Sequence, residues 1–173
     1  MKRVAMGIGI VLGSVAAVGQ AQTKPELAAV SFLIGDWVSG RGDVADTGQQ
    51  STGSSHIQLV ANGGALLRQD RTNLFDKNGR AAGGLDQVML VYPEGGTLRA
   101  DYSDGQHVIH YTSAAVEAGK SVTFSTSPSA AAPMFKLNYT LDDPNTLAVT
   151  FSMAPPGSST FRNIATGTLK KGS

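Results

Sequence analysis

The stretch "FLIGDWVSGRG", Phe32 to Gly42, holds the only tryptophan of the 173-residue chain, set between glycines directly after a short apolar run. Gly35-Asp36-Trp37 has the pattern G-x-W at the start of the first of many expected β-strands. An indole there can cover one end of a β-barrel, and the flanking Gly35 lets the chain turn closely beneath it. Because an indole face attracts cations, we expect Arg162 or Lys170 of the last strand to pack across Trp37 and close the barrel.

Nearly everything after this stretch has the pattern of β-strands, with β-branched and aromatic residues between short turns. Gly, Asn and Asp supply the turns, as in Asn62-Gly63-Gly64 and Asp104-Gly105. Before the strands, Pro25 begins a short predicted helix. We expect about ten strands, over residues 37–41, 54–60, 65–74, 85–92, 97–103, 107–114, 121–125, 134–141, 146–153 and 161–170.

Short turns make neighbours in the sequence neighbours in space, so these strands form an antiparallel meander. Such a meander either leaves two exposed edges or closes on itself, and closure removes both edges. The sequence therefore predicts an all-β fold, an antiparallel up-and-down β-barrel of about ten strands with a short N-terminal helix. A β-sandwich is the competing architecture. The predicted organisation is a signal peptide over 1–21, a linker and helix over 22–34, and one β-barrel domain over 35–171.

The N-terminal segment has the features of a secretory signal peptide. Met1-Lys2-Arg3 is positively charged, the apolar run 4–18 follows, and Gly19 and Ala21 stand three and one positions before a cleavage site at Gln22. The apolar run is shorter than the roughly 20 residues of a membrane-spanning helix. We expect the mature chain to be periplasmic or secreted, with no membrane span after the signal is removed.

Composition argues against several kinds of site. The chain has no cysteine, which excludes disulfides, thiolate nucleophiles and cysteine-ligated metals. Its formal net charge is +1 and it has no basic cluster, so nucleic acid is not an expected partner. Of the three histidines, His107 and His110 are three residues apart on one expected strand and therefore point to opposite faces. We expect no metal site.

The Asp104-Gly105 turn predicts which side chains face inward. If it is a two-residue hairpin loop, Tyr102 lies opposite His107, and cross-strand partners share a face of the sheet. One face is then largely apolar and aromatic and should face the interior: Leu98, Ala100, Tyr102, His107, Ile109 and Tyr111. The other face should meet water: Arg99, Asp101, Val108 and His110.

Side chains with both aromatic and polar parts predict a lining for a small molecule. We expect Tyr102, His107, Tyr111 and Tyr139 to line a cavity. Arg68 and Arg71 face opposite ways on one strand, so one of them should enter the barrel, where it could bind a carboxylate or phosphate. Two alternatives stay open. Either both arginines face solvent or one of them pairs with Asp70 or Asp86, and the interior is a filled core in place of a cavity.

The motif "FLIGDW" resembles the opening of the calycin superfamily, the lipocalins and their relatives, and within it most resembles nitrobindin-like and related secreted lipocalin-like domains. The resemblance implies a barrel with a ligand cavity and a basic residue of the last strand across Trp37. Haem-holding nitrobindin-like proteins use an axial histidine near the C-terminus, whereas the last histidine here is His110. We therefore expect no cofactor, haem included.

Together these patterns favour an exported barrel that binds a small, largely apolar or amphipathic ligand and catalyses no reaction. The alternative is a hydrolase or isomerase on the same barrel that uses His107 as its acid–base group. A further alternative is a structural or interaction module of the cell envelope with a filled core.

Overall fold

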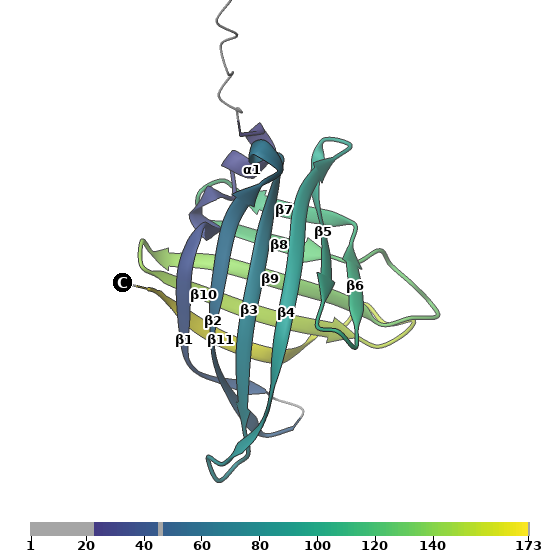
Figure 1. Cartoon of the computed structure of the whole chain (residues 1–173). Helices are drawn as coiled ribbons and strands as arrows, with labels where there is room; N and C mark the ends of the chain where they lie inside the picture. Colours follow the sequence, from purple (N-terminus) through teal and green to yellow (C-terminus); the bar gives the residue numbers. More distant parts are fainter. Residues whose placement is uncertain (1–22, 45–46, 173) are drawn as a thin grey trace, which may run out of the picture.

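The computed structural model of the chain describes residues 23–44 and 47–172, so the predicted signal peptide lies outside the described residues. Over this part of the chain, eleven antiparallel strands form one sheet that curls into a nearly closed barrel (Figure 1). This confirms the predicted all-β barrel rather than a sandwich. The helical elements are α1 (Pro25–Ala28), η1 (Ser31–Leu33) and η2 (Ala61–Gly63). The strands are β1 (Gly35–Val44), β2 (Gln49–Val60), β3 (Ala65–Phe75), β4 (Ala81–Glu94), β5 (Thr97–Ser103), β6 (Val108–Tyr111), β7 (Ser113–Glu117), β8 (Ser121–Ser125), β9 (Met134–Asp143), β10 (Thr146–Ala154) and β11 (Arg162–Lys171).

The barrel closes by two different contacts. The first and last strands pair, with Trp37 opposite Lys171 and Val44 opposite Ala165. At the other side of the sheet, β6 pairs with β5 and β7 pairs with β8, and only Thr112 separates β6 from β7. The expected strand 107–114 is therefore bent at Thr112, and its two halves pair with different neighbours. This bend turns the expected ten strands into eleven and joins the two ends of the sheet.

One end of the barrel, called here the helix end, is covered by α1 and η1 (Figure 1). Leu27, Val30 and Leu33 are buried there, and the carbonyl of Ala29 accepts a hydrogen bond from the N–H of Gly119 at 2.9 Å. The opposite end, called the loop end, carries the loops 104–107, 126–133 and 155–161. The helix end is thus closed by packed apolar side chains.

The hairpin between β5 and β6 differs from the expected register. Tyr102 lies opposite Ile109 rather than His107, because the loop spans four residues, 104–107. The Asp104 carboxylate stabilises this longer loop by accepting the main-chain N–H groups of Gln106 at 2.9 Å and His107 at 2.7 Å. A shift of two residues keeps every strand residue on its expected face, so the prediction fails only for His107, which leaves the sheet.

Candidate functional site

The half of the barrel next to the helix end is filled with side chains. A void inside it has a volume of about 10 Å³, which is close to the space needed for one water molecule. Pockets for small molecules measure several hundred Å³. The core here contains Leu27, Val30, Leu33, Leu66, Val91, Leu98, Ala100, Val122, Phe124 and Leu147. In this half the alternative of a filled core is correct, and the expected ligand cavity is absent from this part of the described structure.

Arg68 is the arginine that enters the barrel, and it is already paired there. Its Nε donates a hydrogen bond to Oδ2 of Asp70 at 2.7 Å, and its Nη2 donates to the same oxygen. Its Nη1 donates to the hydroxyl of Tyr139 at 2.5 Å. The exposed fractions of the Arg68 and Asp70 side chains are 13% and 11%. The inward arginine therefore holds a carboxylate of its own strand.

The surroundings of Arg68 keep its guanidinium charged. Burial alone would lower the pKa of the Arg68 guanidinium, but the Tyr139 oxygen and the Asp70 carboxylate outweigh burial and hold that pKa above its ordinary value. Burial raises the pKa of Tyr139 to about 12, although Arg68 opposes this. Near neutral pH, Arg68 is charged, Tyr139 is neutral, and the Arg68–Asp70 pair has no net charge.

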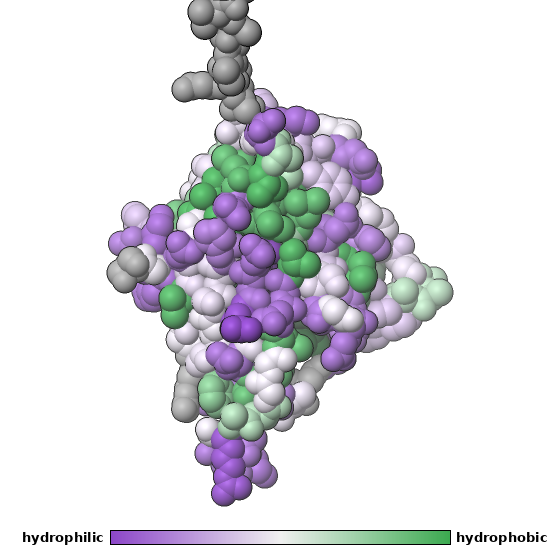
Figure 2. Space-filling view, in the orientation of Figure 1, coloured by the Kyte–Doolittle hydropathy of each residue, from purple (hydrophilic) through white to green (hydrophobic). Residues whose placement is uncertain are grey.

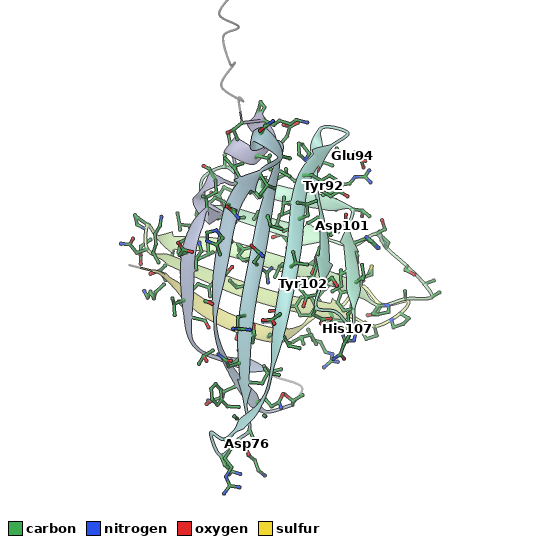
Figure 3. The ribbon with its side chains drawn as sticks, in the orientation of Figure 1. Asp76, Tyr92, Glu94, Asp101, Tyr102 and His107 are labelled. Carbon is green, nitrogen blue, oxygen red and sulfur yellow. The ribbon has the colours of Figure 1, made fainter. Side chains whose placement is uncertain are left out.

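Toward the loop end, three half-buried side chains on the inner face of β3, β4 and β5 form a polar wall: Thr72, Gln87 and Tyr102. Thr72 Oγ1 donates to Gln87 Oε1 at 2.9 Å, and Gln87 Nε2 donates to the Tyr102 hydroxyl at 2.7 Å. Tyr102 in turn donates to Oδ2 of Asp104 at 3.4 Å, and that oxygen lies 3.1 Å from Nδ1 of His107. Figure 3 shows Tyr102 and His107 at the same end of the barrel. One hydrogen-bonded chain thus runs from the interior to the rim.

The facing strands β9 to β11 present an apolar wall, formed by the partly buried residues Phe135, Val149, Phe151, Ala165 and Gly167. The rings of Phe135 and Phe151 stack with their centroids 5.6 Å apart. Gly167 lies opposite Val149 on the inner face, and a Cβ atom built there would meet no heavy atom within 4 Å. The inward position at Gly167 therefore leaves room for added atoms between the polar wall and the apolar wall.

Trp37 is buried at the start of β1, and the cation nearest its ring is neither of the two expected ones. The indole is 1% exposed and donates its N–H to the carbonyl of Leu33 at 2.8 Å. Nζ of Lys171 lies 5.5 Å from the centre of the ring, because Lys171 is directly opposite Trp37. The expectation of Lys170 or Arg162 is wrong. Lys170 is opposite Val38 on the outer face and donates to Thr146, and Arg162 is opposite Met153 at the far end of β11.

Of the other residues expected to line a cavity, the three tyrosines face the interior of the barrel, whereas His107 and Arg71 do not. Tyr102, Tyr111 and Tyr139 face the interior, but Tyr111 lies in the filled half, 6.2 Å from the ring of Phe124, and burial raises its pKa. The His107 side chain is 71% exposed in its loop and lines no interior surface. Arg71 is on the outer face, where its Nε donates to Asp86 at 3.2 Å.

Several residues of the two walls were missed by the sequence prediction. The sequence left open a pairing of one arginine with Asp70, and the structure shows that pair inside the barrel, because Asp70 stands two residues after Arg68 and shares its face of the strand. Thr72 follows the same parity. Gln87 and Phe151 carry no local signal of their own, because their positions depend on which strands face each other across the barrel.

A second concavity lies outside the barrel, as a shallow groove of about 760 Å³ on the outer face of β1 to β4. Two exposed ion pairs line it, His56–Asp36 at 2.6 Å and Arg71–Asp86 at 3.2 Å. The hydrogen bond that the Asp36 carboxylate accepts from the imidazole raises the pKa of His56. Figure 2 shows hydrophilic residues gathered across this face. The groove is open to solvent and differs from the cavity that the sequence predicts.

The described part of the chain has neither a cluster of metal ligands nor a helix that could span a membrane. Within residues 23–44 and 47–172, no group of three or more His, Asp or Glu side chains could hold a metal ion. Each histidine instead pairs through Nδ1 with one aspartate: His56 with Asp36, His107 with Asp104 and His110 with Asp101. In the same described part, no helix has the length and hydrophobicity to cross a membrane.

Among solved structures, the chain is similar to the S-type phycobiliprotein lyase CPES from Guillardia theta, with a TM-score of 0.50 and 10% sequence identity over 83% of this chain and 90% of that chain. The fold is lipocalin-like. A protein of unknown function from the DUF3598 family of Nostoc punctiforme aligns over 87% of this chain and 100% of that chain, with a TM-score of 0.33 and 9% identity. No protein-family model matches the chain, and no curated protein matches it.

Breaking the buried ion pair Arg68–Asp70 should cost more stability than breaking the exposed pair Arg71–Asp86, which also has its arginine on β3. Replacing Asp70 by alanine leaves the guanidinium of Arg68 buried without a counter-charge, so we expect a loss of about 3–5 kcal/mol in the free energy of unfolding, measured by urea denaturation. Asp86→Ala is the matched control, because its pair with Arg71 is exposed, and we expect a loss of at most about 1 kcal/mol. Equal losses would contradict the interior position of Arg68.

Tyr139 predicts a loss of stability at high pH. Its pKa of about 12 in the folded chain exceeds the unfolded value of about 10, so its contribution is complete below the unfolded pKa and is lost as the pH rises toward the folded pKa. We expect the urea midpoint to fall steeply above pH ~10. Tyr139→Phe should show a shallower fall in the same buffers, and an unchanged slope would contradict the burial of this hydroxyl.

Proposed function

We propose that the protein binds a small amphipathic molecule inside the barrel, between the polar wall and the apolar wall at the loop end. The observation that carries the proposal is Gly167, an inward position on the apolar wall where an added Cβ would touch nothing within 4 Å. The polar groups of Thr72, Gln87 and Tyr102 face this apolar surface. Lipocalin-type barrels are wide enough to hold one small ligand between their walls, which supports the proposal.

The two walls favour an amphipathic ligand over the largely apolar one that the sequence predicts. A largely apolar molecule would leave the polar wall facing hydrocarbon, and unpaired polar groups against an apolar surface are costly. A molecule with one polar end and one apolar side matches both walls. The filled helix end limits the depth of binding, so the ligand reaches the site from the loop end.

Two further parts of the proposal rest on the sequence. The charged, apolar and small residues of 1–21 support export to the periplasm or the exterior, and the motif "FLIGDW" supports a nitrobindin-like kinship. The histidines do not fit haem ligation. The side chains of His56, His107 and His110 are 47%, 71% and 72% exposed and pair with aspartates outside the barrel interior. We propose no cofactor.

The binding site is tested with N-phenyl-1-naphthylamine, an uncharged aromatic amine whose fluorescence rises in apolar surroundings. We expect saturable binding to the wild-type chain. Gly167→Phe places a ring in the space between the walls and should weaken binding at least about tenfold, with the thermal midpoint unchanged or higher.

Thr168→Phe is the matched control, because Thr168 is the next residue of β11 and is exposed on the outer face. We expect it to bind the probe like the wild type. Equal binding by Gly167→Phe, or no saturable binding by the wild type, would overturn the proposal. The second outcome would favour a structural or interaction module.

A further inference from the structure

Two buried oxygen atoms on the inner face have no hydrogen-bond partner among the described residues. They are Oγ of Ser55 and Oδ1 of Asp70. Ser55 of β2 lies directly opposite Asp70 of β3, and Gln87 of the polar wall is opposite Asp70 on the other side. Ser55 is 6% exposed. Buried polar atoms in folded proteins are nearly always hydrogen-bonded. Two unpaired oxygens on directly opposite residues of β2 and β3 therefore indicate that a polar group of a bound molecule forms hydrogen bonds with them.

The charge of the neighbouring ion pair limits what that group can be. Both Arg68 nitrogens that reach Asp70 contact Oδ2, which leaves Oδ1 unused. The pair is neutral as a whole. A ligand carboxylate would add an uncompensated negative charge next to a buried aspartate, and a ligand ammonium would leave a net positive charge, both at a large desolvation cost. The expectation that the inward arginine binds a carboxylate therefore does not suit Arg68.

The hydrogen-bonding capacity of the Asp70 and Ser55 oxygens limits which uncharged group can bind to both. An ionised aspartate only accepts hydrogen bonds, while a serine hydroxyl both donates and accepts. A hydroxyl or primary amide matches this pair, because it donates to one oxygen and accepts from the other. A carboxylate has no hydrogen to give to Asp70.

We propose that the ligand carries an uncharged hydrogen-bond donor, a hydroxyl or a primary amide, which donates to Oδ1 of Asp70 and accepts from the hydroxyl of Ser55. This inference rests on the proposed function and names the chemistry of the ligand's polar end. The apolar part of the ligand then extends along Val149 and Phe151 toward the loop end. Gln87 connects the Ser55–Asp70 position with the polar wall, because it lies opposite Asp70 and donates a hydrogen bond to Tyr102.

The test uses four ligands with the same eight-carbon chain: octanamide, 1-octanol, octanoate and octylamine. Each displaces N-phenyl-1-naphthylamine from the wild-type chain at pH 7.5, and the fluorescence of Trp37, the only tryptophan, gives a second readout because Trp37 lies opposite Ser55. We expect octanamide and 1-octanol to bind at least about tenfold more tightly than octanoate and octylamine.

Ser55→Ala separates binding from folding. Removing an unpaired buried hydroxyl should leave the thermal midpoint unchanged or higher, while the affinity for octanamide falls about fivefold or more and that for octanoate does not. Ser54→Ala is the matched control, since Ser54 is the preceding residue and is exposed on the outer face. We expect no change in either affinity for this control.

The outcomes distinguish the two proposals. If octanoate binds the wild type as tightly as octanamide, or if Ser55→Ala keeps the full preference for octanamide, the inference about the polar end is wrong while binding of N-phenyl-1-naphthylamine still supports the proposed function. If neither this probe nor any eight-carbon ligand binds, both proposals are wrong.

Discussion

The ion pair between Arg68 and Asp70 divides the interior of the barrel into two parts with different contents. A guanidinium inside a barrel has to be paired, because the desolvation free energy of an isolated buried charge exceeds the stabilisation that packing of the side chain provides. Asp70 supplies the counter-charge from the same face of β3, and Tyr139 holds the guanidinium from the opposite wall. On the helix side of this pair the core is apolar and filled, and on the loop side the polar wall begins. The candidate site follows directly from this division.

The way the barrel closes makes the loop end the accessible one. Trp37, held by Leu33 and covered by Lys171, fixes the start of β1 against the end of β11. The apolar residues of α1 and η1 seal the same end. At the opposite side of the sheet, the bend at Thr112 lets one run of chain pair with β5 and then with β8. These three contacts close the barrel without a ligand. Packed apolar side chains fill the helix end and leave no room for one there.

Local signals explain why the fold could be predicted from the sequence. Turn residues and alternating apolar residues are encoded in short segments, so the expected strands 97–103 and 121–125 match β5 and β8 at both ends. The identity of the cation on Trp37 depends on the register between β1 and β11, which are far apart in the sequence, and a one-residue difference exchanges Lys170 for Lys171. The four-residue loop 104–107 depends on the Asp104 carboxylate binding main-chain N–H groups, which a turn motif alone does not reveal.

The candidate site could be predicted only in part, for the same reason. Strand parity predicted that one of Arg68 and Arg71 enters the barrel and that Tyr102 and Tyr111 face its interior. Whether those side chains line a cavity or fill a core depends on the packing of the facing strands. Because Arg68 is paired with Asp70, it is half of a neutral ion pair and is not available to bind an acidic ligand. This pairing becomes evident only when the positions of both side chains are known.

The position of a bound molecule tests the account most directly. Intermolecular nuclear Overhauser effects between N-phenyl-1-naphthylamine and the methyl groups of the chain would locate it. The account predicts contacts with Val149 and Ala165 of the apolar wall and none with Leu27 or Leu66 of the filled half. Contacts confined to Val38 and Val88, which line the outer groove, would contradict it.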